Sequence, residues 1–228
     1  MKKTKIYGET ATGYFIPVLN NREIRAAAGI MFLMAFISLT FIISAANFVP
    51  IKYVLSIFLL EFTVRLFIHP RYAPILIIGR LIVSNQFPEY VGAAQKKFAW
   101  YIGFTISVIM FILMVILNTY SPVTGIACLI CLILMFCESA FGICAGCILY
   151  RLIKKDKAQY CPGEVCEVNQ KHEIQKLSVT QKLILLLLAV FVVLIVFLFG
   201  RYYNEKPHRL FPQNASVSIP EDTINRNL

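Results

Sequence analysis

Residues 26–46 read AAAGIMFLMAFISLTFIISAA, a run of 21 residues without a charged side chain. A transmembrane helix needs about 20 apolar residues to cross the hydrocarbon core of a bilayer. The run is therefore long enough to cross. It follows 25 mostly polar residues, whereas a cleaved signal peptide has a shorter apolar core close to its basic start. We expect this helix to be retained.

Four further apolar stretches follow, and the sequence therefore predicts an all-α, polytopic membrane helix bundle with four core spans plus a fifth peripheral span. The stretches are Tyr53–His69, Phe98–Asn118, Val123–Tyr150 and Leu183–Gly200. A shorter stretch, Ala73–Ser84, is too short to cross a bilayer by itself, and a sixth span is the less favoured alternative for it. We expect it to form an interfacial or re-entrant helix with Arg80 at the water side.

Composition supports the same class. Apolar residues make up 58% of the chain and charged residues 15%, against about 45–50% and about 25% in soluble globular proteins. The net charge is +10, but the basic residues lie between apolar runs. We therefore expect them to set topology and to contact the lipid bilayer, and we expect no binding to nucleic acid.

The distribution of Lys and Arg predicts an orientation. With the N-terminus inside, the inner segments hold sixteen of them and the outer segments five. Cytoplasmic loops carry such an excess, so we predict that the N-terminus is inside and the C-terminus outside. The predicted segments are a cytoplasmic N-terminus (1–25), a four-span core (26–153), a cytoplasmic polar linker (154–182), a fifth helix (183–200) and a poorly ordered exoplasmic tail (201–228).

Three charged residues lie inside the predicted spans, where a charge at the helix centre costs about 2.5–3.5 kcal/mol. Glu61 and Arg65 are four residues apart and can pair on one face of a helix. Glu138 has no basic residue one turn away, so it either stays protonated or meets Arg65 in an acid–base–acid cluster. These residues serve either helix packing or a proton or ion relay.

Cys144 and Cys147 form a Cys-x-x-Cys pair at the predicted inner membrane edge. Such a pair can cycle between dithiol and disulfide, whereas a buried free cysteine can also be simple packing. Redox pairs of the thioredoxin type lie at a helix N-terminus, where the dipole stabilises a thiolate. A continuous fourth span places this pair near a helix C-terminus instead. We interpret Cys128 and Cys131, which have the same spacing among Leu and Ile, as packing.

The rest of the fourth span predicts two distinct faces. On a continuous helix Cys137 shares a face with the Cys-x-x-Cys pair, while Glu138 lies on another face, level with Gly142 and Gly146. The two glycines have the small-xxx-small spacing that lets a second helix approach closely. We therefore expect one packed, acid-bearing side and one thiol side.

A metal site is the weaker reading of the cysteines. Cys144, Cys147, Cys161 and Cys166 could offer four thiolates on the inner face, but we predict no metal and no cofactor. The sequence has no P-loop, no dinucleotide-binding glycine fingerprint and no Gly-x-Ser-x-Gly elbow. It leaves enzymatic activity open and favours a chain that has no activity by itself.

Residues 14–153 resemble an uncharacterised family of bacterial integral-membrane proteins, catalogued as domain of unknown function four-three-nine-five. The similarity is carried by PVLNNREIRAAAGIMF (17–32), QKKFAWYIG (95–103) and ESAFGICAGCILY (138–150). The resemblance implies a bacterial cytoplasmic (inner) membrane, and it picks out Gly142, Cys144, Gly146 and Cys147. It also implies thiol redox or sulfur handling with a thioredoxin-like or sulfurtransferase partner. Cys161 and Cys166 lie outside it.

Three hypotheses follow. The leading one is thiol redox or sulfur handling through Cys144 and Cys147. The second is transport of a small sulfur species or anion, because Glu61, Arg65 and Glu138 lie within the spans. The third is a non-catalytic membrane scaffold subunit.

Overall fold

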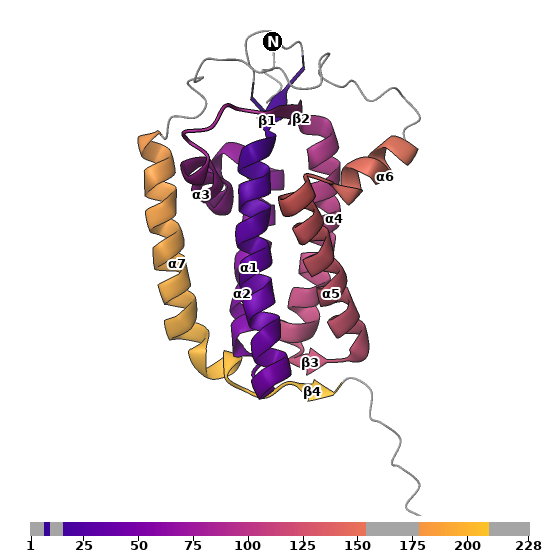
Figure 1. The fold of residues 1–228 in the computed structure, drawn as a ribbon. Coiled ribbons are helices and arrows are strands. Elements are labelled where there is room, and N and C mark those ends of the chain that lie inside the picture. The colour runs from indigo at the N-terminus through magenta and orange to yellow at the C-terminus, as the bar shows by residue number, and fades with distance from the viewer. Residues whose placement is uncertain (1–6, 10–15, 154–177, 210–228) are drawn as a thin grey trace, which may run out of the picture.

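The computed structural model describes residues 7–9, 16–153 and 178–209, which form a bundle of helices with two short strand pairs at its ends (Figure 1). In chain order the elements are β1 (Val18–Asn20), α1 (Asn21–Ala45), α2 (Val49–Thr63), the π-helix η1 (Val64–Ile68), the 3-10 helix η2 (Pro70–Tyr72), α3 (Pro74–Ile82), β2 (Tyr90–Gly92), α4 (Ala93–Phe111), the π-helix η3 (Ile112–Ile116), β3 (Thr119–Tyr120), α5 (Pro122–Phe136), the π-helix η4 (Cys137–Phe141), α6 (Ala145–Ile153), α7 (Val179–Tyr203) and β4 (His208–Arg209).

The predicted all-α bundle is confirmed. Within the described residues, four helices are long and apolar enough to cross a membrane, namely α1, α4 with η3, α5 with η4, and α7. The second predicted span corresponds to α2 followed by η1, which returns beside α1 (Figure 1). It carries Lys52, Glu61 and Arg65 and is not among the four. The prediction of five crossings therefore stays a prediction.

Two helices begin earlier than the sequence predicts. α1 starts at Asn21, because the side chain of Asn20 accepts a hydrogen bond from the backbone N–H of Arg22 (3.1 Å) and caps the helix. α4 starts at Ala93, five residues before the predicted span. As a result Glu23 and Lys96, which the hydropathy pattern assigns to polar segments, lie on helices and are buried.

The short apolar stretch forms α3, a nine-residue helix that packs on α1 and α7 (Figure 1). The expectation that Arg80 lies at the water side is wrong. Its guanidinium is buried and pairs with Glu23 (3.0 Å) and Glu9 (3.2 Å). The reason is a close approach of α3 to α1, where a Cβ on Gly79 would lie 2.6 Å from the carbonyl oxygen of Glu23.

The prediction of one continuous fourth span is also wrong. α5 and η4 end at Phe141, and α6 starts at Ala145 and leaves the bundle at an angle (Figure 1). The predicted linker is described only from Ser178 onwards and the predicted tail only as far as Arg209, so Cys161 and Cys166 lie outside the described residues.

α7 is attached to the core by polar contacts at both of its ends. Near its start, Gln181 donates a hydrogen bond to the carbonyl oxygen of Arg71 (3.1 Å). At its end, the buried ammonium of Lys52 donates to the carbonyl oxygens of Tyr203 (3.1 Å) and Glu205 (2.9 Å). A parallel pairing of β3 with β4 follows directly.

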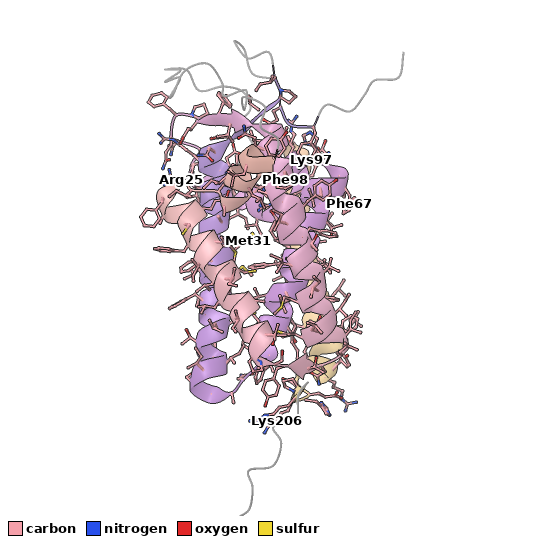
Figure 2. All side chains as sticks on the ribbon, turned by 90° about the vertical axis from the view of Figure 1, so that its right-hand side faces the viewer. Arg25, Met31, Phe67, Lys97, Phe98 and Lys206 are labelled. Atoms are coloured by element: carbon pink, nitrogen blue, oxygen red, sulfur yellow. The ribbon has the colours of Figure 1, made fainter. Side chains whose placement is uncertain are left out.

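Side chains project from every helix, and many large apolar ones point away from the bundle (Figure 2). Phe197 on α7, for example, is 85% exposed. A soluble protein rarely leaves so large an apolar surface uncovered, whereas acyl chains cover it in a bilayer. The outer surface therefore fits a multi-pass membrane protein.

The contacts of Lys52 predict that its removal loosens α7. In Lys52→Met the carbonyl groups of Tyr203 and Glu205 lose a charged donor, which we expect to cost about 1.5–3 kcal/mol. Thermal unfolding in detergent and limited proteolysis between α6 and α7 would measure the loss. The exposed Lys182, at the other end of α7, provides the control Lys182→Met. Equal stability of the two variants would contradict the prediction.

Candidate functional site

The fourth predicted span is interrupted at Gly142, between η4 and α6 and next to the Cys-x-x-Cys pair. Gly142 has a φ of 69°, in the left-handed region that favours glycine, and its N–H donates to the carbonyl oxygen of Glu138 (3.1 Å). The N–H of Ile143 donates to the carbonyl oxygen of Cys137 (3.1 Å). These two bonds close the end of η4 and turn the chain out of the helix.

Arg25 of α1 stabilises this helix end from outside. Its Nε donates to the carbonyl oxygen of Ser139 (3.2 Å) and its Nη2 to that of Ala140 (3.0 Å). Terminal helix carbonyl groups have no partner within the helix, and a cation is favoured beside them. Arg25 and Lys97 lie at the same end of the bundle (Figure 2). The interruption is thus built into the fold by contacts from a second helix.

Cys144 occupies the N-terminal boundary of the next helix. Its carbonyl oxygen accepts hydrogen bonds from the N–H groups of Cys147 (3.0 Å) and Ile148 (3.1 Å), the first bonds of α6. The expectation that the pair lies near a helix C-terminus is therefore wrong. The predicted fourth span is divided into α5 with η4 and a separate helix, α6. The partial positive charge of the α6 N-terminus lies beside the thiol of Cys144 and favours its thiolate.

The two thiols interact with each other. The hydrogen bond that Cys147 donates to the sulfur of Cys144 holds the pKa of Cys144 below its usual value; burial opposes this shift, and the nearby ammonium of Lys96 adds to it. The same hydrogen bond, followed by burial, raises the pKa of Cys147 well above its usual range. Cys144 is therefore the more nucleophilic thiol, and Cys147 is the proton donor beside it.

An ion pair between Lys96 and Glu138 lies close to the two thiols. The ammonium of Lys96, which is buried, lies 2.8 Å from a carboxylate oxygen of Glu138. Of the two alternatives given for Glu138, the contact with Arg65 is not formed, because Lys96 pairs with Glu138 and Glu61 pairs with Arg65. Sequence reasoning missed Lys96 because it precedes the apolar run. The available signal was its position within one helical turn of that run.

The two glycines of the small-xxx-small pattern have different tasks. A Cβ on Gly146 would lie 2.5 Å from the Cβ of Ala99, so α6 packs against the backbone of α4 at this point. A Cβ on Gly142 would instead face Arg25 at 3.6 Å. The expectation of a single packed side with an opposite thiol side is wrong, because the interruption lies between these residues and brings Glu138 close to Cys144.

Glu61 and Arg65 form the predicted pair, 2.7 Å apart and fully buried. The carboxylate of Glu61 also accepts hydrogen bonds from the backbone N–H groups of Ile75 (2.8 Å) and Leu76 (3.1 Å), the first turn of α3. The guanidinium of Arg65 lies over the ring of Trp100, 5.2 Å from its centroid. This pair therefore joins η1, α3 and α4.

A cavity of about 130 Å³ connects the two groups of charges. Arg65 of the first group and Glu138 of the second line it, together with Trp100, Ser107 and Cys144. The remaining lining is mostly apolar. Met31, which belongs to it, lies in the interior of the bundle (Figure 2).

A second, smaller cavity of about 50 Å³ continues along the bundle. It shares Cys131 and Ser107 with the first cavity, and Cys128 lines it as well. In the part of the chain that the structure describes, no group of three or more His, Cys, Asp or Glu side chains could hold a metal ion. The four-thiolate alternative includes Cys161 and Cys166 and is not tested.

Residues 19–155 match the family described as a domain of unknown function, DUF4395. No curated protein and no solved structure matches this chain. The match covers the core from β1 to α6, with Arg25, Lys96, Glu138 and the Cys-x-x-Cys pair, and it excludes α7.

The close contact at Gly146 generates a matched pair of variants. In Gly146→Ala the added methyl overlaps Ala99, so α6 must shift, which we expect to cost about 1–3 kcal/mol and to separate Cys144 from Lys96. In Gly125→Ala the added methyl meets nothing within 4 Å. Iodoacetamide should modify Cys144 more slowly at pH 7 in the first variant only. Equal rates in both variants would contradict the role assigned to this contact.

The charge of Lys96 generates a pH prediction. A thiolate forms above the pKa of its thiol, so the lowered pKa of Cys144 gives more thiolate at neutral pH. Lys96→Gln removes the cation that helps to lower this pKa, and the alkylation curve of Cys144 should move to higher pH. Lys96→Gln/Glu138→Gln should move it in the same direction without leaving a carboxylate unpaired.

The neighbouring Lys97 provides the control for this measurement. Its ammonium lies over the ring of Tyr7, 4.3 Å from the centroid, and Lys97→Gln should leave the curve in place. A curve that also stays in place in both Lys96 variants would show that Lys96 does not influence the thiol.

Proposed function

This chain belongs to the DUF4395 family, and from the geometry of its core we propose that it is an integral membrane protein that acts in thiol redox or sulfur handling through Cys144 and Cys147. The observation that carries the proposal is the position of Cys144 at the N-terminus of α6. There its sulfur accepts a hydrogen bond from Cys147 and lies within the field of Lys96.

The proposed reaction is thiol–disulfide exchange with a thioredoxin-like protein. The thiolate of Cys144 attacks one sulfur of the partner disulfide, a mixed disulfide forms, and the other partner sulfur leaves as a thiolate. Cys147 then attacks the sulfur of Cys144, releases the second partner sulfur and gives up its proton. The partner is reduced to a dithiol and Cys144–Cys147 is oxidised to a disulfide. In reverse, a partner dithiol gives two electrons to this disulfide.

A sulfurtransferase partner would use the same two thiols. The thiolate of Cys144 would accept a sulfane sulfur from a partner persulfide and leave the partner with a thiolate. Attack of Cys147 on Cys144 would then release hydrosulfide and leave the Cys144–Cys147 disulfide. Both reactions need one nucleophilic thiol and one thiol that acts second, and this asymmetry is what the pKa directions of Cys144 and Cys147 support.

We further propose that the thiol pair faces the cytoplasm of a bacterial cell. The helix α6, at whose start the pair lies, is at the same end of the bundle as β1 and the start of α1 (Figure 1). The excess of Lys and Arg in segments at this end supports a cytoplasmic location. The partner would then be a cytoplasmic protein that approaches α6.

The transport hypothesis receives less support from the charges that motivated it. Glu61 and Arg65 neutralise each other, as do Lys96 and Glu138. Glu61 in addition caps α3. Transport and a scaffold role both stay predictions.

The order of attack gives the test of the proposed function. Cys147→Ser retains the nucleophile and lacks the thiol that acts second, so it should trap a mixed disulfide with an oxidised thioredoxin-like protein. Cys144→Ser should trap little, because burial still raises the pKa of the remaining Cys147 thiol after the hydrogen bond to Cys144 is lost. Non-reducing gel electrophoresis followed by mass spectrometry would identify the link.

Cys137→Ser is the matched control, since this cysteine lies on η4 before the interruption, and its variant should exchange like the unchanged chain. Absence of a trapped species in both variants of the pair, together with full resistance of both thiols to alkylation, would contradict the proposal. Trapping by Cys144→Ser alone would reverse the assigned roles.

A further inference from the structure

The cavity beside Cys144 has the size and walls of a site for a single ring. Its volume of about 130 Å³ compares with an apolar cavity of about 150 Å³ that binds benzene. Phe58, Phe62 and Trp100 contribute aromatic walls. Aromatic walls favour a flat ligand, because rings pack in offset-stacked or edge-to-face geometry.

One residue that lines this cavity, Trp100, has a polar atom without a partner. Trp100 is 3% exposed, and its Nε1–H has no hydrogen-bond partner among the described residues. Buried indole N–H groups normally donate to an acceptor. A ligand that brings a carbonyl oxygen into the cavity would supply this acceptor.

The charges around the cavity favour an uncharged ligand. Arg65 is balanced by Glu61, and Glu138 is balanced by Lys96. An anion that entered the cavity would lose its hydration without gaining a free cation, which is unfavourable in an apolar environment. A neutral ring with carbonyl groups has no such cost.

The cavity also lies close to the lipid-facing surface. Leu134 lines it and is at the same time 37% exposed on the outer face of α5. Part of the cavity wall is therefore a side chain that also faces the surroundings of the bundle. We infer that a ligand dissolved in the bilayer enters the cavity on this side.

We propose that this cavity binds the ring of a membrane quinone, which takes two electrons from the Cys144–Cys147 pair. The proposal rests on the proposed thiol redox function and names its electron acceptor. The two thiols lose two electrons and two protons and form one disulfide bond. The quinone gains the same electrons and protons, and its two carbonyl oxygens become the hydroxyl groups of a hydroquinone. Cys144 lines the cavity and would contact the ring, with Cys147 beside it.

The test uses the purified full-length chain in lipid nanodiscs, reduced and then freed of reductant without oxygen. Decylubiquinone is added, and its ultraviolet absorbance and the free thiols are followed together. We expect one quinone to be reduced for each Cys144–Cys147 pair that becomes a disulfide. Cys144→Ser should abolish the reaction.

Two variants test the cavity itself. Trp100→Phe keeps an aromatic ring beside Arg65 but removes the N–H, and should raise the KM for the quinone about fivefold to tenfold, the value of one hydrogen bond. Ala28→Leu fills part of the cavity and should slow quinone reduction more strongly. Ala35→Leu is the matched control, because Ala35 lies two turns further along α1 and lines only the smaller cavity.

Exchange with a small aromatic disulfide, measured on the same samples, separates this proposal from the function on which it rests. We expect Trp100→Phe and Ala28→Leu to retain that exchange while they lose quinone reduction. If the unchanged chain performs the exchange but does not reduce decylubiquinone, the quinone proposal is wrong and the thiol function stands. If neither reaction occurs, both are wrong. If Ala28→Leu and Ala35→Leu slow quinone reduction equally, the quinone does not bind in this cavity and the proposal is wrong.

Discussion

The fold depends on how backbone groups at helix ends are satisfied where water is scarce. A helix in hydrocarbon pairs the backbone N–H and C=O groups of its middle turns with each other, but it leaves those at its ends without partners. In this chain buried or half-buried charged side chains supply the partners at three ends. Arg25 binds the last carbonyls of η4, Glu61 binds the first N–H groups of α3, and Lys52 binds the carbonyls at the end of α7.

Two of these charges permit a feature that a bundle of uninterrupted helices does not have. Arg25 stabilises the interruption from which α6 leaves the bundle. Glu61 allows a short helix, α3, to start inside the fold. Such charged side chains inside membrane helices invite a transport interpretation. Here they are more directly explained by the helix ends that they contact.

The sequence predicts the helices of this fold well and the interruption poorly. Apolar length alone identifies α1, α4 and α7, because the bilayer thickness fixes how many residues are needed. The segment Phe141–Ile143 is as apolar as the helix before it, so hydropathy cannot reveal that the helix ends there. What ends it is the left-handed backbone of Gly142 and the guanidinium of Arg25, more than 110 residues away in sequence.

In the candidate site, too, local features are visible in the sequence and tertiary contacts are not. The spacing of Cys144 and Cys147 and that of Glu61 and Arg65 are visible in the sequence, since both are local. The contact of Lys96 with Glu138 is not, because it depends on where α4 begins and on how α4 packs against η4. The helix end at which the thiol pair lies also depends on tertiary structure. On a continuous helix the same residues would lie at the end whose dipole opposes a thiolate.

The attachment of α7 bears on the independence of the family domain. Lys52 lies within the segment that matches the family, whereas the carbonyls that it binds belong to residues beyond that segment. A protein cut after α6 would keep an interior ammonium and lose both of its acceptors. The domain boundary drawn from sequence similarity therefore cuts through contacts that this chain makes, and expression should retain both parts.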